Sequence, residues 1–87
     1  MYVILVYDVS VKRVNKVCQF LRQYLNWIQN SVFEGEITKS EYFIIKETLK
    51  KLINEEEDSV IIYILRSENA MKKICIGIEK TDIGHII

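Results

Sequence analysis

Continuous apolar runs in the sequence predict several β-strands. Residues 2–7 and 59–65 are rich in β-branched and apolar side chains, which is typical of strands covered on at least one face. Residues 27–34 mix β-branched and aromatic side chains with polar ones and predict a further strand, and residues 73–78 alternate loosely as another. We expect Gly35 to form the turn that follows residue 34.

Apolar residues at helical spacing predict two helices. The first runs from about residue 11 to 25, with Ser10 as its N-cap. The second runs from about residue 38 to 54 and begins with Thr38 and Glu41 in the pattern of a capping box. The apolar stripe of the first helix comprises Val14, Cys18, Leu21 and Leu25.

The remaining segments connect these elements. The acidic cluster at residues 55–58 is placed in a loop, because acids at a helix C-terminus oppose the helix dipole. Residues 68–71 fit a short helical turn, and the apolar tail at 83–87 should pack on another surface, for example on a partner subunit. The pattern alone reads as β-α-β-α-β-β, which supports an α+β sandwich without fixing its topology.

Length and composition indicate one compact domain. The chain has 87 residues, no proline and three glycines, with 49% hydrophobic and 28% charged residues. A domain of this size has a marginal core, which dimerisation would reinforce. No apolar run approaches the ~18 residues of a membrane span, and residues 1–7 are too short for a secretory signal. A cytoplasmic location is therefore expected. Cys18 and Cys75 match no metal spacing and are expected to be small buried side chains.

The net charge is zero, but the charges are unevenly distributed along the chain. Residues 34–58 hold eight acids against four lysines, whereas the charged residues among positions 1–33 are mostly basic. This asymmetry fits either one basic and one acidic face or two ordinary solvated helix surfaces. The basic residues of the first part, opposed there by Asp8, are Lys12, Arg13, Lys16 and Arg22.

Asp8 is the main candidate for catalysis and for metal binding. It ends the first strand, where ligand sites of layered α/β structures gather. A carboxylate there would bind Mg²⁺, and a metal-bound water would attack a phosphodiester. The alternative is that Asp8 caps the turn before the first helix. Lys12, Arg13 and Lys16 stand at a helix start, where the dipole disfavours cations, so either a phosphate backbone compensates them or they are simply solvated.

Four further residues are expected to support this site. Tyr7 points to the opposite face from Asp8 and should pack in the core or an interface, and Phe33 should pack in the core or at the dimer interface. Ser10 and Ser31 carry hydroxyls that would hydrogen-bond a phosphate or a metal-bound water, although helix capping is the simpler role for Ser10. Trp27 is expected to pack rather than to stack on a base.

Three segments together resemble the CRISPR-associated protein Two family, the small universal subunit of CRISPR adaptation. They are Tyr7-Asp8-Val9 followed by Arg13, the stretch Gln-Asn-Ser-Val-Phe-Glu-Gly at residues 29–35, and Glu-Asp-Ser-Val-Ile-Ile-Tyr at residues 57–63. The resemblance implies a ferredoxin-like β-α-β-β-α-β sandwich spanning residues 1–87. It also implies a homodimer in which residues 1–78 form the core and residues 79–87 cross as a strand to the partner.

The same resemblance implies a function. A subunit of this family would bridge two dimers of the CRISPR adaptation integrase and support the DNA to be inserted, with possible Mg²⁺-dependent endonuclease activity on RNA or DNA. The two Asp8 residues of the dimer would face each other near its twofold axis. The alternative is a toxin-type ribonuclease or a small-ligand regulatory module on the same fold, since fold does not determine function.

Overall fold

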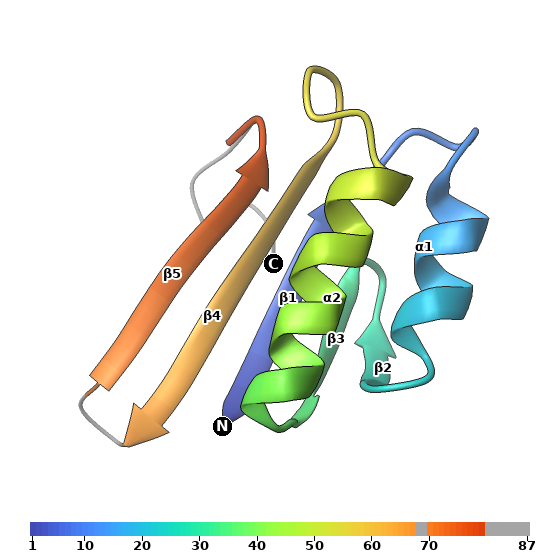
Figure 1. The fold of residues 1–87 in the computed structure, drawn as a ribbon. Helices are drawn as coiled ribbons and strands as arrows, with labels where there is room; N and C mark the ends of the chain where they lie inside the picture. Colours follow the sequence, from blue (N-terminus) through green and yellow to red (C-terminus); the bar gives the residue numbers. More distant parts are fainter. Residues whose placement is uncertain (68–69, 80–87) are drawn as a thin grey trace.

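The computed structural model describes residues 1–67 and 70–79 and contains one antiparallel sheet with two helices (Figure 1). The sheet order is β2-β3-β1-β4-β5, so that β1 is the central strand. The elements are β1 (Tyr2–Asp8), α1 (Val14–Leu21), β2 (Asn26–Gln29), β3 (Val32–Glu36), α2 (Lys39–Leu52), β4 (Ser59–Ser67) and β5 (Ala70–Gly77).

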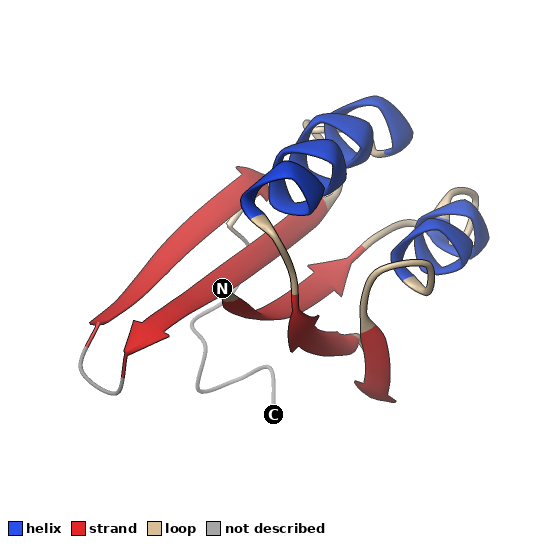
Figure 2. Ribbon diagram, turned by 60° about the horizontal axis from the view of Figure 1, so that its bottom comes forward, coloured by secondary structure: helices blue, strands red, loops and turns tan. Residues whose placement is uncertain are grey.

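The topology is β-α-β-β-α-β followed by β5, which confirms the expected ferredoxin-like α+β class. Leu5 of β1 lies opposite Phe33 of β3 on one side and Ile62 of β4 on the other. Both helices cover the same face of the sheet (Figure 2). The main core lies between the helices and this face. Successive side chains of a strand point to opposite faces of the sheet, so every second residue of a strand enters this core.

The region predicted as a single strand at residues 27–34 is instead a hairpin of two strands. Its turn lies at Asn30, which has a positive φ of 45°, a conformation that Asn tolerates better than most residues. Gly35, predicted as the turn, lies within β3, so that prediction was wrong. A Cβ at Gly35 would lie 3.2 Å from Leu25 Cδ2, so the glycine allows the segment before β2 to pack closely on β3.

The two predicted helices exist, but their ends differ from the prediction. α1 is shorter than residues 11–25, and Arg13 rather than Ser10 is its N-cap, with no side-chain capping bond. The Ser10 hydroxyl instead accepts a hydrogen bond from the Lys12 backbone N–H at 3.3 Å. The capping box of α2 is confirmed: Glu41 N–H donates to Thr38 Oγ1 at 3.0 Å, and Thr38 N–H donates to Glu41 Oε1 at 2.9 Å.

The helical turn predicted at residues 68–71 was wrong for its second half, because β5 begins at Ala70. Residues 68–69 and the tail at 83–87 lie outside the described residues. Cys18 is half-buried, but Cys75 is exposed, contrary to expectation. Cys75 pairs with Ile61 on the face of the sheet opposite the helices, and β5 is an edge strand, so its side chain is less covered than the pattern suggested.

The face of the sheet opposite the helices carries a second, smaller apolar cluster. Val6, Ile61 and Tyr63 form it and are each less than a tenth exposed. Ile4 and Val32 are partly buried and pack against them. The sheet is therefore apolar on both faces, which agrees with the continuous apolar runs of β1 and β4.

Candidate functional site

Asp8 lies at the carboxyl end of the central strand, opposite Ser59 of β4. Its side chain is exposed. A carboxylate at this place is the type of oxygen ligand that Mg²⁺ takes while it retains several waters. Among the described residues, no group of three His, Cys, Asp or Glu side chains is arranged to hold a metal ion.

Tyr7 points away from Asp8 into the helix-covered core, where it is 7% exposed. Its ring centroid lies 5.8 Å from that of Phe33, which is fully buried. The Tyr7 hydroxyl lies 3.2 Å from Cys18 Sγ and donates to the Asn30 carbonyl at 3.3 Å. Burial, followed by the Cys18 contact, raises the pKa of Tyr7 to about 12, so this phenol is neutral at physiological pH. Tyr7 and Phe33 therefore pack together in the core, and their support of the site stays a prediction.

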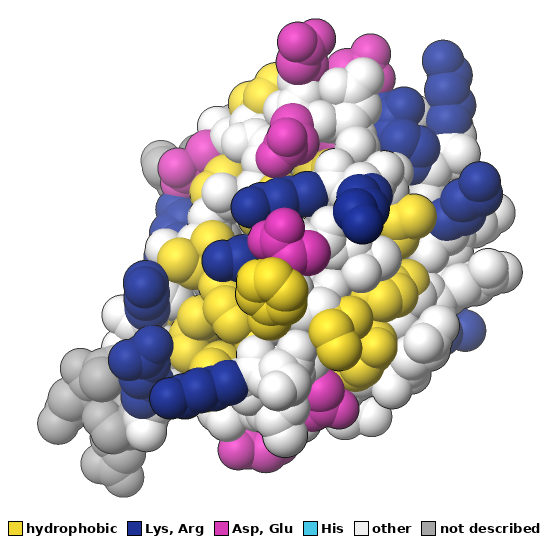
Figure 3. Space-filling view, in the orientation of Figure 1, with side chains coloured by type: hydrophobic (Ala, Val, Ile, Leu, Met, Phe, Trp, Pro, Cys, Tyr) yellow, Lys and Arg dark blue, Asp and Glu magenta, His cyan; other side chains and the backbone are white. Residues whose placement is uncertain are grey.

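The loop after Asp8 turns directly into α1 and carries the predicted basic residues. The N–H groups of Arg13 and Val14 both donate to the Ser10 carbonyl, at 2.9 and 3.0 Å, which curls the loop into a helical turn. Lys12 and Lys16 are exposed on this turn and on α1. Figure 3 shows Lys and Arg side chains gathered over α1 at the right of the molecule. Lys12 and Lys16 thus place two exposed cations on the segment that follows Asp8, and their role in binding nucleic acid stays a prediction.

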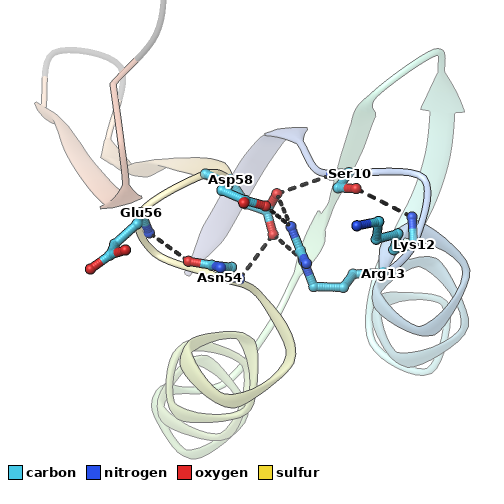
Figure 4. A network of polar contacts seen from close by, with 7 residues as sticks. Ser10, Lys12, Arg13, Asn54, Glu56 and Asp58 are labelled. Atoms are coloured by element: carbon cyan, nitrogen blue, oxygen red, sulfur yellow. Dashed lines mark hydrogen bonds and ion pairs between the residues drawn. The ribbon is translucent and has the colours of Figure 1, made fainter.

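Arg13 does not extend into solvent as Lys12 and Lys16 do. Its Nε donates to Asp58 Oδ2 at 2.7 Å, and its Nη2 donates to Asp58 Oδ1 at 3.0 Å (Figure 4). Nη2 also donates to Glu57 Oε2 at 2.8 Å. These bonds raise the pKa of the Arg13 guanidinium above its ordinary value, so its charge is permanent. The role of Arg13 in binding nucleic acid stays a prediction, but its side chain is anchored from within the protein.

Asp58 is the residue around which this network is arranged. It is 1% exposed, and each of its carboxylate oxygens accepts two hydrogen bonds. Beyond the two from Arg13, Oδ1 accepts from the Ser10 N–H at 3.0 Å and Oδ2 from the Asn54 N–H at 2.9 Å. The Arg13 bonds, with help from these backbone groups, hold the pKa of Asp58 well below its ordinary value despite burial. The carboxylate is therefore charged and fully hydrogen-bonded.

The sequence pattern did not reveal this role of Asp58. Residues 55–58 read as a solvated acidic loop, and the loop assignment is right, but its last residue is buried. Asp58 owes its position to the pairing of β1 with β4. Ser59, the first residue of β4, lies opposite Asp8, the last residue of β1, so the residue before Ser59 lies beside the loop after Asp8. That register is visible only in the folded chain.

The remaining predicted residues lie at varying distances from this network. The carbonyl of Ser31 accepts from the Tyr7 N–H at 3.0 Å, so the β2–β3 turn lies beside the end of β1. Trp27, expected to pack, is 52% exposed on the edge strand β2, and its Nε1 donates to the Asn30 carbonyl at 3.0 Å. Asp8 thus ends β1, Ser10, Lys12 and Arg13 follow it in one loop, and Ser31 lies beside the end of β1.

No helix within the described ranges is long and apolar enough to cross a membrane. The antiparallel sheet with both helices on one face defines the class as a small ferredoxin-like α+β protein. A protein-family model, CRISPR associated protein Cas2, matches residues 1–73. The chain belongs to the Cas2 family, and its role is accordingly CRISPR-associated.

Similar proteins cover most or all of the chain. CRISPR-associated endoribonuclease Cas2 of Pyrococcus furiosus is 60% identical over 87 residues, which is 100% of both chains. The protein of the same name from Methanocaldococcus jannaschii is 55% identical over 100% of this chain and 76% of its own length. A crystal structure of Cas2 matches with a TM-score of 0.74 and 46% identity, covering 100% of this chain and 98% of its own. Streptococcus pyogenes Cas2 at pH 6.5 matches with a TM-score of 0.70 and 36% identity, over 79% of this chain and 89% of its own.

Proposed function

We propose that this protein is a CRISPR adaptation subunit that binds nucleic acid as a homodimer, bridges integrase dimers and supports the DNA to be inserted. The observation that carries the proposal is the exposed Asp8 at the end of the central strand, beside a cationic loop that Asp58 anchors. Family membership supports the CRISPR context. The fold alone would leave a toxin-type ribonuclease or a regulatory module open.

Nucleic-acid binding would use the exposed lysines of the loop and of α1. Lys12 and Lys16 each offer a flexible ammonium group to a phosphate oxygen. Arg13 has its Nε and Nη2 committed to Asp58 and Glu57, so Nη1 is the nitrogen that it would direct at a phosphate. Phosphate contacts of this kind position a duplex without reading its sequence. Such a surface suits DNA fragments of arbitrary sequence.

The endonuclease activity that we propose as a second function depends on Asp8. Its carboxylate would hold Mg²⁺, which supplies an activated water and charge stabilisation at the phosphoryl group. A pair of Asp8 residues across a dimer axis, as the family resemblance implies, would bring two carboxylates to one Mg²⁺ site. The name of the relatives in Pyrococcus and Methanocaldococcus, CRISPR-associated endoribonuclease, supports RNA as one substrate class.

Dimerisation would bring residues 79–87 onto the partner subunit. Ile78, the last residue before that segment, is an apolar side chain that is 42% exposed, and exposed apolar side chains of this kind are ones that a partner subunit would cover. Analytical ultracentrifugation at micromolar concentration should give the mass of two chains. A single-chain mass would contradict the dimer.

Substitution of Asp8 by Asn separates the scaffold function from the nuclease. In a spacer-acquisition assay, the scaffold function predicts that Asp8→Asn leaves acquisition intact and the complex with integrase assembled. If acquisition is lost while the complex still assembles, the chemistry of Asp8 is required and the pure scaffold proposal fails. With purified protein, cleavage of RNA or DNA should need divalent metal and disappear in Asp8→Asn. Cleavage that survives this change would come from other residues or from a contaminant.

The nucleic-acid surface is tested by a pair of matched double variants. Lys12→Ala with Lys16→Ala should weaken duplex binding and reduce the slope of log affinity against log salt by about 1.8 per protomer if both lysines contact phosphates. The control variant Arg66→Ala with Lys72→Ala removes the same charge from exposed positions at the far end of β4 and the beginning of β5. Equal losses in both variants would show that net charge matters and that the loop is not the site.

A further inference from the structure

Asp58 contacts two separate parts of the fold at once. Its side chain accepts hydrogen bonds from Ser10 and Arg13 of the β1–α1 loop, whereas its backbone carbonyl accepts from the Ile78 N–H at 3.0 Å. Ile78 directly follows β5, where the chain continues towards residues 79–87. One residue therefore touches both the loop after Asp8 and the exit of the last described strand.

The backbone of Gly77 lies directly against the peptide of Asp58, with no room for a side chain. Its φ is +89°, and a Cβ built at this position would lie 2.2 Å from the Asp58 carbonyl oxygen and 3.1 Å from the carbonyl carbon. Both values lie below or at the limit of normal van der Waals contact with backbone atoms, which cannot turn aside as a side chain can. Any larger residue at 77 has to displace either the end of β5 or the peptide of Asp58.

We propose that Asp58 is a positioning residue for the nucleic-acid site, and that it couples the conformation of the Asp8–Arg13 loop to the path of the chain leaving β5. This rests on the proposed function, because that function makes the loop the binding element. The loop between β1 and α1 holds its own shape through the turn at the Ser10 carbonyl. Asp58, which is 1% exposed, ties it to the α2–β4 connection through charge-assisted hydrogen bonds, which are about twice as strong as neutral ones.

The coupling has a direct consequence for dimer assembly. Ile78 leads directly into the segment that the proposed function places on the partner subunit. Because Ile78 and the loop share Asp58, movement at one end strains the other end through a single peptide and its side chain. A change in the path of the chain at Ile78 would therefore shift the loop that binds phosphate.

The direction of the change in duplex affinity distinguishes an effect of charge from an effect of positioning. Asp58→Asn removes a negative charge beside the cationic loop, so an effect of charge alone would strengthen binding to a polyanion. Loss of positioning would weaken it. We expect duplex affinity, measured by fluorescence anisotropy in moderate salt, to fall at least about fivefold, the lower end of typical coupling between sites. Unchanged or stronger binding would overturn the positioning role.

Glu57→Gln is the matched control for this variant. It removes the same charge from the neighbouring residue, which also binds Arg13, but Glu57 is 63% exposed and does not contact Ser10. Its duplex affinity should stay the same or rise. A fall equal to that of Asp58→Asn would mean that Arg13 alone, and not the anchoring of the loop by Asp58, is responsible.

Hydrogen exchange of backbone amides tests the coupling without any ligand. Gly77→Ala acts from the β5 side and touches no residue of the loop, yet we expect faster exchange at the Ser10 and Asn54 amides, which donate to the Asp58 carboxylate. Amides in the middle of β1 and β4 should remain protected, which shows that the variant is folded. If exchange accelerates only at Ile78 and its neighbours in β5, the coupling is refuted.

The outcomes distinguish a failure of the positioning role from a failure of the proposed function. If the Lys12 and Lys16 variant binds duplex as well as the unchanged protein does, the loop is not the nucleic-acid site and the proposed function fails. The exchange data would still decide whether Asp58 transmits a change at Gly77 to Ser10. Conversely, normal loss of binding in the lysine variant, with no effect of Asp58→Asn, rejects the positioning role alone.

Discussion

Replacement of Asp58 by Asn should lower the free energy of unfolding. Both carboxylate oxygens accept two hydrogen bonds, one from Arg13 and one from a backbone N–H. In whichever direction the Asn amide turns, its NH₂ group faces two donors that it cannot accept from. The Arg13 side chain is 23% exposed and keeps its bond to Glu57, so the main loss comes from hydrogen-bond donors left without an acceptor, which costs about 1–3 kcal/mol. A domain of this length has a total of roughly 4–13 kcal/mol, so the variant should remain folded with clearly reduced stability.

Urea unfolding followed by circular dichroism at neutral pH measures this loss. The midpoint should fall with little change in the slope m, since the surface exposed on unfolding stays the same. Several protein concentrations are needed, because a dimer becomes more stable as the concentration rises. Glu57→Gln, at the exposed end of the same network, should change the free energy of unfolding by no more than about 1 kcal/mol.

The reasoning would be refuted if Asp58→Asn cost less than about 1 kcal/mol, within the range of exposed ion pairs. That result would mean that the Asn amide finds new partners, or that the network around residue 58 opens to water in solution. A loss as large in Glu57→Gln would also contradict it, because the buried and exposed members of the network are predicted to differ.

Three further predictions concern stability. Because the Arg13 hydrogen bonds hold the pKa of Asp58 below its ordinary 3.8, its contribution is complete above that pH and is lost as the pH falls further; the unfolding free energy should therefore decline more steeply between about pH 5 and pH 2 in the unchanged protein than in Asp58→Asn, and parallel curves would contradict this. Thr38→Ala removes the capping box of α2 and should lower the unfolding free energy by about 1 kcal/mol in urea, whereas Ser40→Ala, exposed in the same turn, should cost less. Phe33→Ala leaves a cavity in the fully buried core and should cost about 3–5 kcal/mol, and a loss below that of Thr38→Ala would contradict the core assignment.

Local sequence information was sufficient for several elements. The apolar runs identified β1 and β4, and Thr38 with Glu41 identified the beginning of α2, because each signal lies within a few neighbouring residues. The position of Asp8 at a strand end and the exposure of Lys12 and Lys16 were predicted in the same way. Resemblance to a known family, rather than the pattern, supplied the ferredoxin-like order of the strands.

The predictions that failed concern elements without a local signal. The four residues of β2 are all exposed, so no alternation of apolar and polar side chains marks this strand. The turn at Asn30 that separates β2 from β3 follows from the pairing of Trp27 with Phe33, which is a property of the folded hairpin. The exposure of Cys75 likewise depends on β5 being an edge strand, which is a property of the assembled sheet.

The amino-acid sequence by itself determined where the main strands and helices form and which charged side chains lie near the end of β1. The tertiary structure alone decided that Arg13 and Asp58, 45 positions apart, form a buried ion pair. The antiparallel register that sets Asp8 opposite Ser59 brings the two loops together. Hydrogen bonds between such distant residues have no local pattern, because only the packing of the whole sheet fixes their distance.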